Sequence, residues 1–298
     1  MNTAEIAILR NSMLFSLTRR AWSNRRQADK SKIVTTADKS KLNLTKQLLV
    51  SAELDAITDH MNEVYNWCMG RAMPSATRRG IYFVRRDMVA EFEAALETAL
   101  TKLQTELVPA FLRNYLGQCE EMRTKLGDFF DERDYPGVDV IEASFSIEWS
   151  WLALSVPNEL PEEVREREVA KLRQSYADAQ TEIRQALRTG FKDLVDHAVE
   201  RLTPATDGTP KVFRNSLINN FNEFFDTFHA RNLMDDAELA GAVSQARQIL
   251  SGINPEALRT SDDIRQQVIA GFQQVAALTD GLVVVSQNAR RFSLDDAA

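Results

Sequence analysis

An uninterrupted helical pattern over residues 162–202 constrains the fold more than any other feature of the sequence. Apolar side chains recur every three or four residues and no proline intervenes, at Val169, Leu172, Tyr176, Ala179, Ile183, Ala186, Gly190 and Leu194. A helix over this range would be roughly 60 Å long at 1.5 Å per residue. Because such a helix is longer than a domain is wide, it needs a partner helix. The periodic segment 87–126 is the predicted partner, so we expect a long antiparallel helical hairpin.

Two segments have the pattern of β-strands in this otherwise helical chain. In residues 142–156 the large apolar side chains alternate with polar ones, at Phe145, Ile147, Trp149 and Trp151. Residues 12–23 predict a second strand, and we expect the two strands to pair. A core face explains the tryptophans better than a ligand-stacking surface, because no polar side chains converge on them in the sequence.

The remaining segments complete a mainly α-helical fold with a small β element. A helix is predicted over 52–70, a brief strand at 81–84 and a loop at 203–211. Three shorter helices follow, the last of them starting after Ser261 as its N-cap, and predict a C-terminal helical bundle. The expected organisation is an N-terminal part over 1–160, the long helix 161–202 packing on 87–126, and the bundle over 203–298.

Composition is that of an ordinary globular protein: 298 residues, 44% hydrophobic and 27% charged, with two cysteines. Two cysteines cannot form a disulfide framework, which favours a reducing intracellular compartment. No apolar run approaches the roughly 20 residues that span a bilayer, and no signal-peptide pattern is evident. We therefore expect a cytoplasmic protein that makes no membrane contact.

Charge is distributed unevenly along the chain. Residues 1–50 carry ten Lys/Arg and three Asp/Glu, whereas the whole chain has a net charge of -7. The candidate partner-binding residues are Arg19, Arg20, Arg25, Arg26, Lys30, Lys32, Lys39 and Lys41. Two interpretations of this basic segment, 19–46, are open. It binds the phosphates of DNA or RNA, or it docks on an acidic surface of this protein or of a neighbouring subunit.

No motif in the sequence indicates catalysis. The P-loop, GxGxxG, HExxH and GxSxG patterns are absent. His60, His197 and His229 each have a carboxylate one helical turn away, but none has the second pair that a di-metal bundle requires. Cys68 and Cys119 lack a CxxC partner and are expected to be buried. We predict no enzyme activity, no metal site and no cofactor, with a site assembled from scattered residues as the less favoured alternative.

The acidic cluster between the second helical region and the second strand has a similar interpretation. Its members are Asp128, Asp131, Glu132, Asp134 and Asp139. Nuclease carboxylates normally lie on a rigid sheet, whereas these lie in a turn that contains proline and glycine. We interpret the cluster as a solvated end of a helix.

Five stretches occur in an order that resembles a known family. They are MLFSLTRRAWSNRR, DYPGVDVIEASFSIEWSWLALSVPNEL, KVFRNSLINNFNEFF, NLMDDAEL and LSGINPEALRTSDDIR. Together they resemble a family of uncharacterised proteins from tailed phages and plasmids of bacteria, over nearly the whole chain. Plasmid relatives are found beside MoxR-type ATPases and von Willebrand factor A proteins. The resemblance implies a phage protein in the cytoplasm of the infected host, and an AAA-type ATPase as one partner.

These observations favour a non-enzymatic phage protein that binds macromolecular partners through its helical hairpin, with self-association left open. The alternative is an accessory nucleic-acid-binding protein that uses segment 19–46 in phage DNA metabolism. An enzyme with an unrecognised site is the least favoured function.

Overall fold

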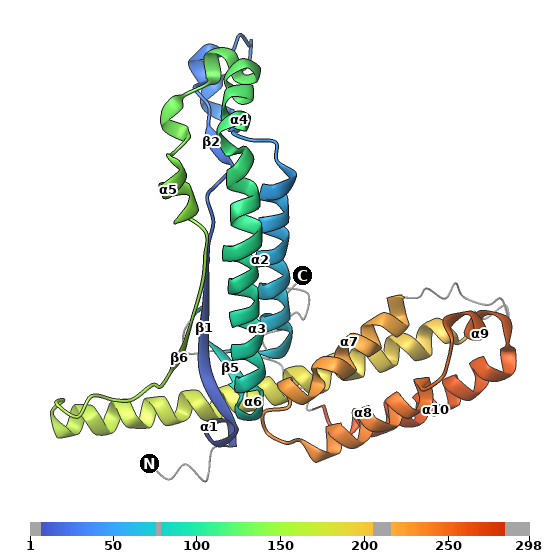
Figure 1. Cartoon of the computed structure of the whole chain (residues 1–298). Coiled ribbons are helices and arrows are strands. Elements are labelled where there is room, and N and C mark those ends of the chain that lie inside the picture. Colours follow the sequence, from blue (N-terminus) through green and yellow to red (C-terminus); the bar gives the residue numbers. More distant parts are fainter. Residues whose placement is uncertain (1–6, 76–78, 205–215, 284–298) are drawn as a thin grey trace. The chain divides into compact units, whose positions relative to one another are not determined.

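The computed structural model describes residues 7–75, 79–204 and 216–283 (Figure 1). Most of the predicted loop 203–211 lies outside these residues. The fold is mainly α-helical with a small antiparallel sheet, as the sequence predicts. The chain forms two compact units. Unit 1 comprises Met1–Phe15, Met69–Val89 and Trp151–Ala298, and unit 2 comprises Ser16–Cys68 and Ala90–Ser150.

Unit 2 is built around a pair of antiparallel helical rods. One is α2 (Ala52–Arg71), which matches the predicted helix, and the other runs through α3 (Val89–Lys102), η5 (Leu103–Leu107) and α4 (Val108–Leu126). The rings of Trp67 and Phe92 lie 5.0 Å apart at one end of the pair. Further along, the buried ring Nε2 of His60 lies 3.0 Å from the Ala99 carbonyl oxygen. The pair is therefore a helical hairpin, and His60 is one of its packing residues.

The second rod continues past Pro109 because a π-helical turn precedes that proline. In η5 the Val108 N–H donates to the Leu103 carbonyl, five residues back instead of four. A proline ring collides with the carbonyl four residues earlier and supplies no N–H of its own. Widening the helix by one residue at this point accommodates the ring and keeps the rod continuous.

Four strands form the larger sheet, in the order β4 (Met73–Pro74), β5 (Tyr82–Arg85), β1 (Ser12–Arg20) and β6 (Ser146–Leu152). The two predicted long strands are thus neighbours, β1 and β6, and the brief predicted strand is β5. Strands β1 and β5 are antiparallel, with Ser12 opposite Arg85 and Phe15 opposite Tyr82. The boundary between the units falls inside both β1 and β6.

Buried and exposed side chains alternate at the start of strand β6, as predicted, but the tryptophans in its second half are less buried than expected. Phe145 and Ile147 are buried, but Trp149 and Trp151 are only half-buried. The Trp149 indole N–H donates to Glu93 Oε1 at 2.9 Å. The expectation that no polar group converges on these tryptophans is therefore wrong, because a helix distant in sequence supplies the carboxylate.

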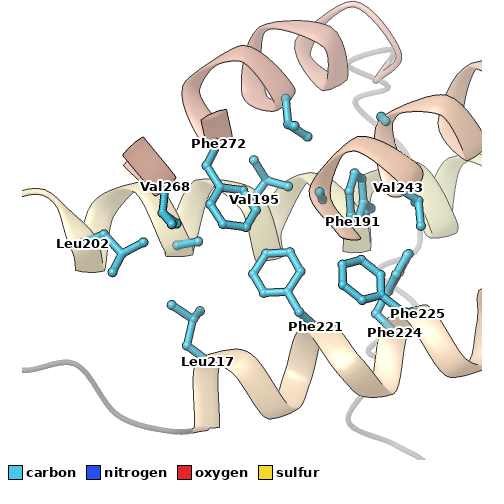
Figure 2. Close-up of a cluster of buried hydrophobic side chains, with 14 of the residues drawn as sticks. Phe191, Val195, Leu202, Leu217, Phe221, Phe224, Phe225, Val243, Val268 and Phe272 are labelled. Carbon is cyan, nitrogen blue, oxygen red and sulfur yellow. The ribbon is translucent and has the colours of Figure 1, made fainter. Parts of the chain in front are cut away.

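The long helix α6 (Glu162–Leu202) has the predicted bounds. Its second half shares a hydrophobic core with α7 (Ser216–Arg231), α8 (Ala237–Leu250), α9 (Pro255–Thr260) and α10 (Asp262–Asp280) (Figure 2). Ser261 caps α10 as expected, since its hydroxyl accepts from the Ile264 N–H. Phenylalanine rings fill the centre of this core, which Figure 2 shows between α6, α7 and α10.

The predicted pairing of α6 with residues 87–126 is not confirmed. In unit 1 the buried Ile183 belongs to a cluster with Ile8, Leu14, Met73 and Phe83, which come from α1 (Ala7–Asn11), β1, β4 and β5. A heptad pattern shows which stripe of a helix is buried but does not identify what covers it. The predicted divisions at residues 160 and 202 stay a prediction, since the two units group segments that are distant in sequence.

The loop between α7 and α8 accepts hydrogen bonds from side chains of β5 and α1, which belong to the same unit. Arg85 Nη1 donates to the Asn232 carbonyl and to Asp235 Oδ1, both at 2.7 Å. Asn11 Nδ2 donates to the Leu233 carbonyl at 2.9 Å. Asp235 adopts a left-handed conformation with φ of 50°. The stretch NLMDDAEL that contributes to the family resemblance therefore has a structural role.

No helix among the described residues is long and apolar enough to cross a membrane. The other short helical elements are η2 (Lys30–Lys32), η3 (Lys39–Lys41), η4 (Arg86–Met88), η6 (Gly127–Phe129), η7 (Glu132–Asp134) and α5 (Val138–Glu142). A two-stranded ribbon of β2 (Arg25–Gln27) and β3 (Thr45–Gln47) completes unit 2.

Candidate partner-binding surface

The ribbon of β2 and β3 has an inner face and an outer face because side chains alternate along a strand. Arg26 lies opposite Lys46 in the ribbon. Lys46 Nζ is 2.7 Å from Asp134 Oδ2 and donates to the Phe129 carbonyl at 2.6 Å, and its side chain is only 9% exposed. Arg26 Nε is 4.0 Å from Asp134 Oδ1. The inner face of the ribbon is thus anchored on the acidic turn 127–135.

The acidic turn is itself well ordered by local contacts. Asp131 accepts from the Arg133 N–H and from the Arg133 guanidinium, which lowers the pKa of Asp131 to about 2. The Tyr135 hydroxyl donates to the Leu48 carbonyl at 2.9 Å, and burial raises the pKa of Tyr135 to about 12. Gly127 opens the turn with φ of 50°. The turn is therefore a docking surface for the ribbon and not only a solvated end of a helix.

Arg19 and Arg20 are also engaged within unit 2. Arg19 Nη1 donates to the Met61 carbonyl at 2.9 Å and to Asn62 Oδ1 at 2.8 Å. Its guanidinium lies 4.1 Å above the centre of the Tyr65 ring. Arg20 pairs with Glu148 across 3.4 Å, with both side chains largely exposed. Arg19 is therefore engaged within the fold and does not belong to the predicted basic surface. Arg20 stays exposed at the edge of that surface.

The segment joining β2 to β3 contains the same five residues twice. ADKSK occurs at 28–32 and again at 37–41. Each copy folds into one turn of 3-10 helix, η2 and η3, with the aspartate as N-cap. Asp29 accepts from the Ser31 N–H and Asp38 from the Ser40 N–H, both at 2.9 Å. We call residues 28–42 the twin-turn loop.

The lysines of the twin-turn loop differ in what they contact. Lys32 donates to the Asp128 carbonyl and lies 6.0 Å from the centre of the Phe129 ring, so it belongs to the anchored inner face. Lys39 donates to the Ser31 carbonyl at 3.4 Å, which links the two turns. Within the described part of the chain, Lys30, Lys41 and Arg25 make no such contact. Arg25 in β2 and Lys41 are exposed and Lys30 is half-buried, so these are the cations that the contacts of the fold do not use.

Ile33 and Val34 lie between the two turns. Val34 is fully exposed, more so than any other large apolar side chain among the described residues. The loop thus combines an exposed aliphatic tip with lysines on both sides.

The other sequence candidates have structural explanations. His229 Nε2 lies 3.2 Å from Asp87 Oδ2, a carboxylate from outside its own helix. Cys68 is buried, and burial raises the pKa of the half-buried Cys119 thiol. Over residues 7–75, 79–204 and 216–283, no three His, Cys, Asp or Glu side chains are grouped as ligands for a metal ion.

Comparisons with protein-family models, with curated proteins and with solved structures find no match to this chain. The phage-family resemblance and the functions it implies therefore stay predictions.

The anchoring of the ribbon is testable through Asp134. Replacing Asp134 with alanine leaves the nearly buried Lys46 ammonium without its carboxylate, which costs about 1–3 kcal/mol for a hydrogen bond to a charged group. Exchange of the Ala28 and Leu48 amide hydrogens, which donate across the ribbon to Leu44 and Asn24, is expected to accelerate by about 5- to 100-fold. Hydrogen exchange followed by mass spectrometry measures this.

The matched control is Asp139→Ala, which removes an exposed carboxylate from α5 in the same unit. It should leave exchange at both amides unchanged. Equal protection in the Asp134 variant would show that the ribbon does not depend on the acidic turn.

Proposed function

We propose that this chain is a non-enzymatic binding protein that contacts an anionic macromolecule through the outward face of the twin-turn loop. The observation that carries the proposal is the division of the basic segment. Arg19, Arg26, Lys32 and Lys46 contact other groups of the fold. Among the described residues, the side chains of Arg25, Lys30 and Lys41 form no such contact; Arg25 and Lys41 are exposed and Lys30 is half-buried. Lysines that stabilise nothing in the fold are available to a partner.

Anchoring makes this surface suited to binding. Each turn is closed by its own aspartate, and the strands on either side are fixed to the acidic turn through Lys46. A loop held in one conformation loses less conformational entropy when a partner binds. The helical hairpin of α2 with α3–α4 belongs to the same unit and serves, in this proposal, as the support of the surface. The predicted hairpin of residues 87–126 with 162–202 is a different pair and is not confirmed, so partner binding through it stays a prediction.

The nucleic-acid function is the second candidate. Arg25 and the outward lysines would contact phosphates, and each neutralised phosphate makes binding more salt-dependent. It is favoured less because several of the predicted basic residues, including Arg19 and Arg26, are occupied within the unit. From the family resemblance alone, we also propose that the protein acts in the cytoplasm of a phage-infected bacterium, with an AAA-type ATPase as one partner to test.

The test is capture from a bacterial lysate with the full chain as bait, with and without nuclease. The variant is Arg25/Lys30/Lys41→Ala, and the matched control is Lys102/Lys125/Lys171→Ala, which removes three exposed cations elsewhere. The loop variant should retain about tenfold less bound material, because three contacts of about 0.5 kcal/mol each approach 1.4 kcal/mol. The control should bind like the unsubstituted protein.

Equal retention by the loop variant and the control would contradict the proposed function. If the bound material is nuclease-sensitive, the nucleic-acid candidate is the one supported. The slope of log affinity against log salt concentration for duplex DNA should then move towards zero by about 2–3 in the loop variant.

A further inference from the structure

The twin-turn loop has a symmetry that narrows the chemistry of its partner. The two ADKSK turns have nearly the same backbone: Asp29 has φ, ψ of -68°, 110° and Asp38 has -64°, 108°. The Ser31 and Ser40 N–H groups lower the pKa of Asp29 and Asp38, so both caps remain ionised at neutral pH. Each turn therefore holds its shape by itself and offers one lysine that no contact of the fold uses, Lys30 in the first turn and Lys41 in the second.

Residues 33–36 connect the two turns. They are two aliphatic residues followed by two threonines, and none of them is charged. Val34 is fully exposed, and Ile33 beside it is half-buried. The Ala37 N–H donates to Thr35 Oγ1 at 3.1 Å, which shapes this connection before the second turn. Because Val34 is fully exposed, its isopropyl group adds nothing to the packing of unit 2.

An aliphatic side chain with cations on both sides matches the usual organisation of a protein-binding surface. Such interfaces have an apolar core surrounded by a polar, solvent-accessible rim. A phosphate backbone has no pocket for Val34. Each turn also carries its own carboxylate, so its net charge is only +1, which is small for a surface that follows a polyphosphate.

We infer that the partner is a protein with a shallow apolar pocket that receives Val34 and is bordered on two sides by carboxylates that meet the lysines of η2 and η3. This inference rests on the proposed function, because it assumes that the twin-turn loop is the contact surface. It adds the class of partner and the residue that anchors it.

The experiment places a photoreactive benzoylphenylalanine at position 34 of the full chain and irradiates it in a bacterial lysate. The control places the same group at position 140, an exposed valine of α5 in the same unit. We expect a cross-linked adduct from position 34 that survives nuclease treatment, and none from position 140. The partner peptide in this adduct should be rich in Asp and Glu. The adduct should fall at least about fivefold when Arg25, Lys30 and Lys41 are replaced by alanine.

Capture with Val34→Ser and with Val140→Ser gives a second measurement. Circular dichroism should show that both variants fold, since neither side chain is buried. Val34→Ser should lose binding by about fivefold, and Val140→Ser should lose none. A nuclease-sensitive adduct, an adduct peptide without carboxylates, or equal capture by the two valine variants would overturn the inference.

These outcomes separate the inference from the proposed function. If capture depends on Arg25, Lys30 and Lys41 but not on Val34, these cations form the binding surface and the inferred apolar pocket on the partner is wrong. If capture depends on neither, the proposed function itself fails.

Discussion

Replacing Phe221 with alanine is expected to lower the free energy of unfolding of unit 1 by about 3–5 kcal/mol, the usual cost of removing a buried aromatic ring. Phe221 has no exposed surface, and its ring lies 5.0 Å from Phe272 and 5.7 Å from Phe225 (Figure 2). Neighbours on three helices cannot close the cavity without moving those helices. Urea unfolding followed by circular dichroism measures the loss.

The control for Phe221 is Leu278→Ala in α10, where half of the leucine surface is exposed. Its cost should stay below about 1 kcal/mol, since little apolar area leaves a core. A Phe221 variant as stable as this control would show that α6, α7 and α10 do not share the core described here.

The second large effect concerns the ion pair between Arg188 and Asp236. Arg188 donates to both carboxylate oxygens of Asp236, at 2.6 and 2.9 Å, and the two side chains are only 14% and 5% exposed. Asp236 is also the N-cap of α8 and accepts from the Leu239 N–H. Arg188→Met keeps most of the side-chain volume but leaves a buried carboxylate without its cation. We expect a loss of about 3–5 kcal/mol at pH 7.

The stability lost in Arg188→Met should depend on pH, because Asp236 titrates. Burial would raise the pKa of Asp236, but the hydrogen bonds from Arg188 and from the Leu239 N–H outweigh burial and lower it. A lowered pKa stabilises the folded state above the unfolded value of about 4, and that contribution is lost as the pH falls through the folded pKa. The difference between Arg188→Met and the unsubstituted protein should therefore shrink between pH 7 and pH 3.

Lys192→Met is the matched control on the same helix. Lys192 contacts Asp196 at 2.8 Å and also Asp280, but both carboxylates are largely exposed. Its loss should stay below about 1 kcal/mol, as for other surface pairs. Equal losses at Arg188 and Lys192, or a loss at Arg188 that is independent of pH, would contradict the stabilising role of the buried pair.

Local sequence patterns predicted the elements of this fold closely. The bounds of α6 follow from unbroken helical periodicity between Pro161 and Thr203, and the start of α10 follows from the capping hydroxyl of Ser261. The alternation around Phe145 and Ile147 predicted strand β6. These signals are readable because they depend on residues within one or two turns of each other.

The candidate surface was predictable only in part. The sequence identified a basic segment but could not separate Lys46, which is nearly buried against Asp134, from Lys30 and Lys41, which are not. That difference depends on a turn more than 80 residues further along the chain, as the contact between Lys46 and Phe129 shows. The duplicated ADKSK was visible in the sequence, but its meaning depends on the common capped turn that both copies adopt.

By itself, the sequence determined that this protein is mainly helical, where its long helix begins and ends, and which side chains are apolar enough to be buried. Tertiary packing sets what covers α6, because a periodic apolar stripe packs on any complementary surface and its partners here come from α1, the sheet and the C-terminal helices. It also decided which cations are structural. Opposite charges attract whatever their separation in sequence, so the carboxylate that meets Lys46 is fixed by the folded chain and not by any local pattern.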